Sequence, residues 1–255
     1  MNNRLLYIGA DTHGLEAARR YLETTSCPIA SAPTKEVTHL LLNIPTFTPD
    51  GNLAGGGDLN HILESLSPAV TVIGGNMRDP ILQGYPTIDL LRNESYLAHN
   101  AAITAECALQ LAYNHYPDTI RGTPILILGW GRIGKCLAQL LQAIGAEVAV
   151  AARKETDIGM IAALGHQAVP LHTITARLPR YRIIFNTVPY MILPELLALQ
   201  CRADCLKIDL ASVPGIGGSN VIPARGLPGK LMPEAAGRLI AATVLDLIKE
   251  KEVIP

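Results

Sequence analysis

A glycine-rich segment that joins a strand to a helix constrains the fold of this chain most. The pattern Gly-x-Gly-x-x-Gly lies at residues 129–134, directly after the apolar run 124–128 and directly before the helical pattern 135–144. In that context the first glycine permits a tight turn, the second lets the backbone approach a pyrophosphate, and the third lets the helix pack on the strand. The segment predicts a dinucleotide-binding Rossmann domain rather than a glycine-rich turn without a nucleotide. The predicted cofactor-binding residues of this loop are Gly129, Trp130, Gly131, Arg132, Ile133 and Gly134.

The end of the next predicted strand, 147–151, indicates which dinucleotide is bound. A domain selective for NAD usually carries Asp or Glu there, which hydrogen-bonds the ribose 2′-hydroxyl. This chain has Arg153 and Lys154 instead. A guanidinium can bind a 2′-phosphate bidentately, whereas a carboxylate would repel it. The pair therefore favours NADP over NAD, and the alternative is two solvated cations at a strand end.

Apolar runs alternate with helical patterns along the chain, which is typical of an α/β protein with largely parallel sheets. We expect two Rossmann-like parallel-sheet domains with an interdomain cleft. Residues 1–99, together with a C-terminal helix in 233–255, would form a substrate-side domain, and residues 100–232 the nucleotide-binding domain. The predicted strands lie at 4–9, 37–42, 69–73, 87–89, 124–128, 147–151, 167–169, 183–186 and 206–210.

Helices and loops are predicted between these strands. A helix at 15–22 follows the first strand, and an Ala-rich helix at 100–113 bridges the domains and ends before Pro117, which cannot continue the ladder. The glycines of 50–58 predict a loop, either a mobile flap or a plain connection. A further loop at 226–230 precedes a helix at 233–251.

The loops after the later strands should face the nicotinamide, because ligands of open α/β sheets sit beyond the carboxyl ends of the strands. Asn186 and Thr187 can offer polar contacts, and Val188 with Pro189 an apolar surface. Asp209 could either cap its strand or bind the cofactor. Ala211 and Ser212, which follow it, complete the predicted cofactor-binding set.

Composition excludes several other classes. A net charge of −1 and a pI near 6.6 give no bulk field for nucleic acid or an anionic membrane. No apolar run has the roughly 20 residues of a membrane span, and the N-terminus lacks a signal-peptide core, so we expect a cytoplasmic location. Five cysteines without CxxC spacing argue against a disulfide framework or a metal site. Cys201 and Cys205 could share a helix face, although ordinary semi-buried thiols are favoured.

In their order and spacing, several motifs resemble the A-type subunits of dipicolinate synthase over most of the chain. They are Asn100 with Thr104-Ala105-Glu106, the loop 129–134, Ala152-Arg153, Asn186-Thr187-Val188-Pro189 with Met191-Ile192-Leu193, Asp209-Leu210-Ala211-Ser212, Pro214-Gly215, 226–230 with Pro233, and Ala236-Gly237.

The resemblance implies a two-domain fold like that of the D-2-hydroxyacid dehydrogenases. It also implies an NADP-linked oxidation of a dihydrodipicolinate-type dicarboxylate from the lysine pathway, a role in sporulation, and the B-type subunit of dipicolinate synthase as partner. This chain departs from the family pattern at Cys107, Val213 and Ala235, where the family usually has glycine, arginine and threonine. Val213 thus removes a cation that a dicarboxylate would favour.

Four residues are candidates for substrate chemistry. Arg92 and Lys230 could anchor carboxylates, and Glu106 and His99 could act as bases. The alternatives are a solvated cation for Arg92, a helix-start residue for His99 and a hinge hydrogen bond for Glu106. The competing functions are an NADP-dependent dehydrogenase of another small carboxylate and a dinucleotide-binding subunit without catalytic activity. We expect a homo-oligomer.

Overall fold

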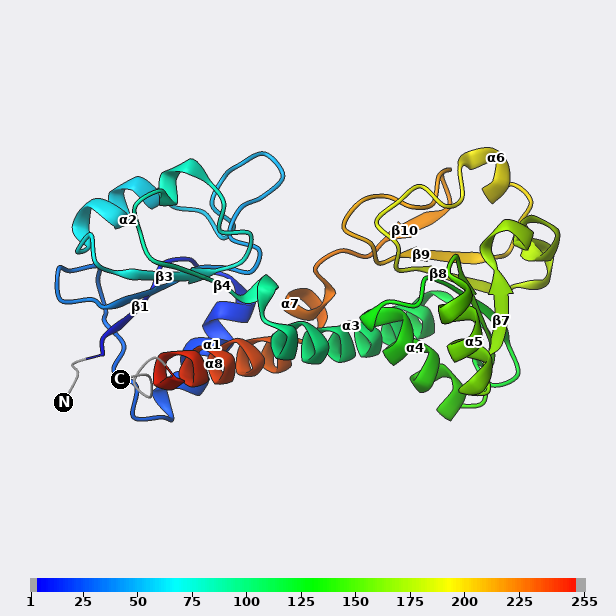
Figure 1. Ribbon diagram of the computed structural model, residues 1–255, viewed down its shortest axis with the longest axis horizontal. Coiled ribbons are helices and arrows are strands. Elements are labelled where there is room, and N and C mark those ends of the chain that lie inside the picture. The colour runs from blue at the N-terminus through cyan, green and yellow to red at the C-terminus, as the bar shows by residue number, and fades with distance from the viewer. Residues whose placement is uncertain (1–3, 251–255) are drawn as a thin grey trace. The chain divides into compact units, whose positions relative to one another are not determined.

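The computed structural model describes residues 4–250, which fold into two compact α/β units (Figure 1). Unit 1 comprises the chain up to Asn100 together with the segment from Pro228 onward, and unit 2 comprises Ala101–Leu227. Each unit has its own parallel sheet, one of four strands and one of six. The predicted fold class, with two parallel-sheet units, is confirmed. Within residues 4–250, no helix combines the length and apolar character that crossing a bilayer requires.

Unit 1 is built on a sheet whose strands follow sequence order. They are β1 (Leu6–Ile8), β2 (His39–Leu41), β3 (Thr71–Gly74) and β4 (Thr87–Asp89). One face of the sheet packs against α1 (His13–Glu23) and α8 (Pro233–Glu250), and the other against α2 (Leu59–Ser65) and the short helix η1 (Pro80–Leu82). A 3-10 helix, η2 (Leu90–Arg92), follows β4.

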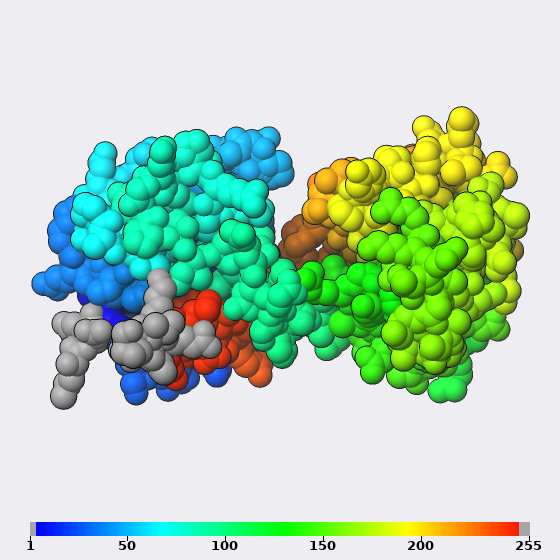
Figure 2. Space-filling model, in the orientation of Figure 1, coloured from blue at the N-terminus to red at the C-terminus, as the bar shows by residue number. Residues whose placement is uncertain are grey.

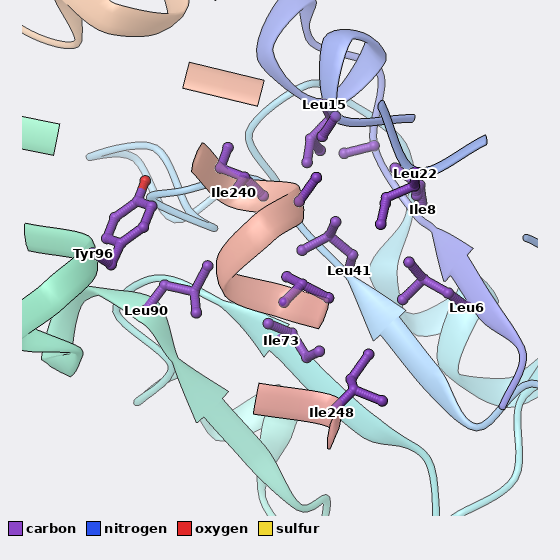
Figure 3. Packing of buried hydrophobic residues seen from close by; sticks show 14 residues of the cluster. Leu6, Ile8, Leu15, Leu22, Leu41, Ile73, Leu90, Tyr96, Ile240 and Ile248 are labelled. Atoms are coloured by element: carbon purple, nitrogen blue, oxygen red, sulfur yellow. The ribbon is translucent and has the colours of Figure 1, made fainter. Parts of the chain in front are cut away.

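The core of unit 1 joins residues from both ends of the chain. Figure 3 shows Leu15 of α1 and Ile240 of α8 in one cluster with Leu41 and Ile73 of the sheet. The two helices approach closely, because a Cβ on Gly237 would lie 2.5 Å from the backbone nitrogen of Ala18. Burying each such large apolar side chain contributes about 1.5–3 kcal/mol, so α8 is a main part of this core.

Unit 2 has the strand order of a doubly wound Rossmann sheet. Its strands, in spatial order, are β10 (Val221–Pro223), β9 (Leu206–Asp209), β8 (Ile183–Asn186), β5 (Pro124–Leu128), β6 (Glu147–Ala152) and β7 (Gln167–Pro170). The chain starts at β5, winds outward to β7, and then returns to β8 on the other side of β5. The order therefore reverses between β5 and β8, which is where such sheets bind dinucleotides.

Helices cover both faces of this sheet. α4 (Arg132–Ala143) and α5 (Glu155–Ala163) pack on one face. α6 (Glu195–Ala198) and the 3-10 helix η4 (Thr175–Arg180) pack on the other, where Leu126 and Leu128 of β5 are fully buried. A further short 3-10 helix, η3 (Leu171–Thr173), follows β7. α3 (Glu94–His115) begins in unit 1 and continues into unit 2.

Most predicted elements differ from the structure by a few residues at their ends, and two predictions of local structure differ more. α3 starts at Glu94 rather than at Asn100, because the side chain of Asn93 caps the helix by accepting from the backbone N–H of Tyr96 at 2.8 Å. The predicted loop 226–230 is mostly a helix, α7 (Leu227–Leu231), since Pro228 suits a first turn. The final residue of the predicted helix 233–251 lies outside the described residues.

Candidate dinucleotide-binding site

The loop between β5 and α4 has the geometry that a pyrophosphate requires. Gly129 adopts a φ of +103°, which favours glycine, and a Cβ on Gly134 would lie 2.3 Å from the carbonyl oxygen of Gly129. A Cβ on Gly131 would meet nothing within 4 Å, so the space beside its backbone is open. Gly131 also caps α4 without a side-chain hydrogen bond, which leaves the helix N-terminus open to an anion.

The loop after β8 is fixed against this phosphate loop at the point where the strand order reverses. Thr187 donates two hydrogen bonds to the carbonyl of Leu128, from its backbone nitrogen at 3.0 Å and from Oγ1 at 2.9 Å. A Cβ on Gly129 would come within 2.6 Å of the side chains of Thr187 and Val188. Thr187 and Val188 therefore lie beside the phosphate loop, as their predicted role requires.

Asp209, at the end of β9, holds two loops together with its carboxylate. Oδ1 accepts from Asn186 Nδ2 at 2.8 Å and from the backbone N–H of Ala211 at 3.2 Å. Oδ2 accepts from the backbone N–H groups of Gly215 at 2.7 Å and Ile216 at 3.2 Å. Because these contacts use both carboxylate oxygens, the geometry favours the capping alternative over direct cofactor binding.

Asn186 extends the same network to the loop after β8. It is fully buried, and its amide oxygen accepts from the backbone N–H of Val188 at 3.1 Å. Its Nδ2 donates to the carbonyl of Val188 at 3.0 Å as well as to Asp209. A Cβ on Gly215 would lie 2.2 Å from Nδ2, which explains the need for glycine there. Asn186 thus shapes the loop from within.

The predicted 2′-phosphate cations lie at the carboxyl end of β6. Arg153 and Lys154 are both exposed, and Lys154 precedes the first residue of α5. The backbone N–H of Gly129 donates to the carbonyl of Ala151 at 2.9 Å, which ties the phosphate loop to this strand end. The cations are therefore close in the fold to the loop that would hold the pyrophosphate.

The side chain of Trp130 is buried rather than exposed on the loop. Its ring is buried and meets the ring of His166 edge to face at 5.8 Å, and Lys135 Nζ lies 5.8 Å from the ring centre. Burial lowers the pKa of His166, which favours a neutral imidazole beside the indole. Trp130 can contact a cofactor through its backbone. It is also the only tryptophan in the sequence.

Apolar side chains surround the ends of β8 and β9. Figure 2 shows this part of the chain, coloured yellow, on the surface of unit 2. Tyr190 is 75% exposed, Met191 50% and Val213 52%, and Pro189 and Ser212 are also exposed. The predicted apolar surface for a nicotinamide ring thus belongs to an exposed loop region.

Sequence reasoning missed Arg225, which follows β10. Its Nε donates to the carbonyl of Ala211 at 3.1 Å, and the neighbouring Ala224 N–H donates to the carbonyl of Asp209 at 2.8 Å. Arg225 therefore places a cation beside the loop that carries Val213. The short apolar run before Arg225 is the signal that could have indicated it, because a cation after a strand end faces the ligand side of a parallel sheet.

The four candidates for substrate chemistry are all exposed. Arg92 ends η2, and Lys230 lies in α7. His99 and Glu106 lie on α3, where His99 Nδ1 donates to the carbonyl of Ser95 at 2.8 Å. That bond ties the imidazole to its own helix and leaves Nε2 for other contacts. The roles of all four stay predictions.

The Rossmann sheet and its phosphate loop define the chain as an NAD(P)-dependent oxidoreductase. Residues 94–191 match the family described as D-isomer specific 2-hydroxyacid dehydrogenase, NAD binding domain. The apo-structure of D-lactate dehydrogenase from Escherichia coli shares the fold with a TM-score of 0.60 at 14% identity, covering 98% of this chain and 97% of that one.

The similarity to the A-type subunit of dipicolinate synthase is stronger and spans nearly the whole chain. This subunit of the Bacillus subtilis (strain 168) synthase is 25% identical, over 97% of this chain and 96% of its own. The crystal structure of the Bacillus halodurans counterpart has a TM-score of 0.82 at 23% identity, covering 96% of this chain and 97% of that one. The resemblance that the motifs predicted is confirmed.

Proposed function

We propose that this chain catalyses the NADP-dependent oxidation of a dihydrodipicolinate-type cyclic dicarboxylate to dipicolinate, in the cytoplasm of a spore-forming cell. The end-to-end similarity to the A-type subunit of dipicolinate synthase carries the proposal. By the same similarity, the chain would act with the B-type subunit of such a synthase, and we propose that it forms a homo-oligomer. Unit 2 would hold the dinucleotide, and unit 1 is the proposed substrate-side unit, with Arg225 of unit 2 supplying one cation for the substrate.

The residues of unit 2 fit the cofactor. The backbone of Gly131 and the first turn of α4 would bind the pyrophosphate, and Arg153 with Lys154 the 2′-phosphate. When bound, NADP supplies the hydride acceptor for the reaction. Asp209 and Asn186 would keep the nicotinamide-side loops in place, so that little reorganisation is needed when the ring docks.

The substrate has two carboxylates, and Arg225 supplies a cation for one of them. Its guanidinium is held by the carbonyl of Ala211, beside the position where the family carries an arginine and this chain has Val213. Arg92 and Lys230 remain proposed anchors. Loss of a hydride and a proton makes the ring aromatic, and His99 and Glu106 are the proposed bases for the proton.

Replacing Arg153 tests the choice of cofactor. Arg153→Ala removes a charge-assisted contact worth about 1.5–3 kcal/mol, so the Kd for NADPH should rise roughly ten- to hundredfold. The Kd for NADH should stay unchanged, because NADH has no 2′-phosphate. Calorimetric titration measures both constants, with Arg177→Ala, another exposed arginine of unit 2, as the control. Tighter binding of NADH than of NADPH by the unaltered protein would show that the NADP assignment is wrong.

Replacing Arg225 tests the substrate cation. Arg225→Gln should raise the KM for the dicarboxylate roughly tenfold or more, because a charged hydrogen bond is worth about 1.5–3 kcal/mol. The Kd for NADPH should not change. The KM of Arg225→Lys should lie between those of the unaltered protein and Arg225→Gln, because lysine keeps the positive charge but lacks the planar guanidinium. An unchanged KM in Arg225→Gln would remove Arg225 from the substrate site.

The reaction itself is tested by following NADPH formation from freshly generated dihydrodipicolinate, with and without the B-type subunit of a dipicolinate synthase. NADPH formation in either case supports the proposal. Tight binding of NADP without turnover in both cases would contradict it and favour a dinucleotide-binding subunit without catalytic activity. Turnover of another small carboxylate alone would favour the second dehydrogenase hypothesis.

A further inference from the structure

Exposed apolar side chains gather on one part of unit 2, in the segments 187–200 and 210–224 that follow β8 and β9. Of the nine large apolar side chains that are exposed within residues 4–250, five belong to these segments: Tyr190, Met191, Leu196, Leu199 and Val213. The yellow segment of Figure 2, which contains α6, protrudes from unit 2. Single exposed leucines are common on protein surfaces, but a group of this kind marks an interaction surface.

The two segments pack together, so their exposed side chains belong to one surface. The backbone N–H groups of Ile192 and Leu193 donate to the carbonyl of Gly215 at 2.8 and 3.0 Å, and the N–H of Gly217 donates to the carbonyl of Leu193 at 2.7 Å. A Cβ on Gly217 would lie 2.8 Å from the backbone nitrogen of Glu195. The segment after β9 therefore runs directly against the start of α6, and backbone contacts hold the surface in place before a partner arrives.

α6 turns its apolar residues to solvent. Ala198 is buried against the core of unit 2, but Leu196 and Leu199 are 78% and 73% exposed. These two leucines are three residues apart, so they are neighbours on the outward side of the helix, and Glu195 is the neighbour of Leu199 one turn earlier. The outward side of α6 thus combines two leucines with one carboxylate.

The surface is almost without charge, which argues against a membrane as its partner. Glu195 is the single charged residue of the segments 187–200 and 210–224, although 17% of the whole chain is charged. Surfaces that bind anionic lipids combine apolar side chains with lysine and arginine. A surface whose one charge is negative is instead typical of a protein interface, in which charged residues are depleted at the centre.

A second copy of this chain also fits the surface poorly. Two copies of one chain usually meet across a twofold axis, so that the same residues face one another. A contact centred on α6 would then oppose the two copies of Glu195, and opposed like charges weaken an interface. A partner with a cation at that point fits better.

We propose that the segments 187–200 and 210–224 form the docking surface for the B-type subunit of the synthase, whose matching surface is apolar and places a cation opposite Glu195. The inference rests on the proposed function, which supplies this partner because the relatives are A-type subunits of a synthase. The docked subunit would lie beside the loops after β8 and β9, at the edge of unit 2 that holds the proposed cofactor site.

Calorimetric titration of the full chain with the B-type subunit of the same organism tests the surface. Leu196→Glu and Leu199→Glu should each raise the Kd for this subunit at least roughly tenfold, because each would bury an unpaired carboxylate in the complex. Leu164→Glu is the matched control, since Leu164 is a 54% exposed leucine that follows α5, and it should leave the Kd unchanged. All three variants should keep the melting temperature and the Kd for NADPH, because these side chains already face water.

Replacing Glu195 tests the charge of the partner. Glu195→Gln should raise the Kd for the B-type subunit roughly tenfold and make it less dependent on salt concentration, because the cation of the partner loses its counterion. Asp118→Asn, at an exposed carboxylate outside the surface, is the control and should change neither property.

Several results would overturn the docking surface. They are no measurable binding of the B-type subunit, or an unchanged Kd in Leu196→Glu and Leu199→Glu. Loss of self-association of the chain alone in these variants, measured by sedimentation velocity, would assign the surface to a second copy. Loss of binding to vesicles of phosphatidylcholine and phosphatidylglycerol would assign it to a membrane.

NADPH formation from dihydrodipicolinate, measured separately, distinguishes this inference from the proposed function. Docking at the surface without NADPH formation would contradict the proposed reaction and leave the docking surface in place. NADPH formation by a chain that does not use this surface would contradict the docking surface alone.

Discussion

Gly131→Val should leave unit 2 folded but weaken dinucleotide binding strongly, whereas Gly134→Ala should disrupt the loop itself. A Cβ at residue 131 enters open space, so the fold tolerates it, but the added side chain occupies the approach of the pyrophosphate. Losing one or two backbone hydrogen bonds to a charged phosphate costs about 1.5–3 kcal/mol each, which corresponds to at least a roughly tenfold rise in Kd.

Gly134→Ala has a different physical consequence. Its Cβ would lie 2.3 Å from a backbone oxygen, so the start of α4 must move away from β5. Such overpacking costs about 1–3 kcal/mol or more and should lower the melting temperature as well as the affinity. The two glycines of one motif therefore separate a binding defect from a folding defect.

The single tryptophan makes this experiment direct. Trp130 lies inside the loop, so its fluorescence reports both NADPH binding and the melting of unit 2. Gly159→Ala is the control, because Gly159 lies in α5 with nothing within 4 Å of the added Cβ. This substitution should raise the stability of unit 2 slightly. Unimpaired NADPH binding by Gly131→Val would mean that the pyrophosphate does not approach this backbone.

Asp209→Ala should be the most destabilising substitution in unit 2. It leaves three backbone N–H groups and the amide of Asn186 without their acceptor in a buried environment. Removing one partner from a buried charged network costs about 3–5 kcal/mol, which should lower the melting temperature by roughly 6–20 °C. Asp209→Asn keeps the shape and one acceptor, so its effect should be smaller.

Thermal unfolding followed by Trp130 fluorescence checks this prediction. Asp118→Ala, at an exposed position of the same unit, is the control and should melt close to the unaltered protein. NADPH affinity should also fall in Asp209→Ala, because the loops after β8 and β9 lose their common anchor. If Asp209→Ala melts normally but loses NADPH binding, the carboxylate acts on the cofactor and not on the loops.

The elements that could be predicted well from the sequence are those with a short, continuous residue pattern. The strands 124–128, 183–186 and 87–89 were predicted with the bounds that the structure has, because each is an apolar or β-branched run ended by a polar residue or a glycine. β10 and α6 were missed, since three or four residues carry too little periodicity to stand out. The helix α7 was missed because two glycines and a proline indicated a turn.

The residues of the candidate site also differ in how far the sequence could predict them. The phosphate loop could be predicted because its motif is local, and its three glycines each have a distinct geometric reason. Asp209 and Arg225 could not be assigned, because their roles depend on backbone groups of neighbouring loops and strands.

The two units differ in when their last residues are synthesised. Unit 2 is one continuous stretch, whereas unit 1 needs both the first hundred residues and the segment that follows Leu227. All residues of unit 2 are therefore synthesised before Ile240, Val244 and Ile248, which complete the core of unit 1. The core of unit 1 therefore stays incomplete until α8 has been synthesised, so unit 2 can fold first and unit 1 last.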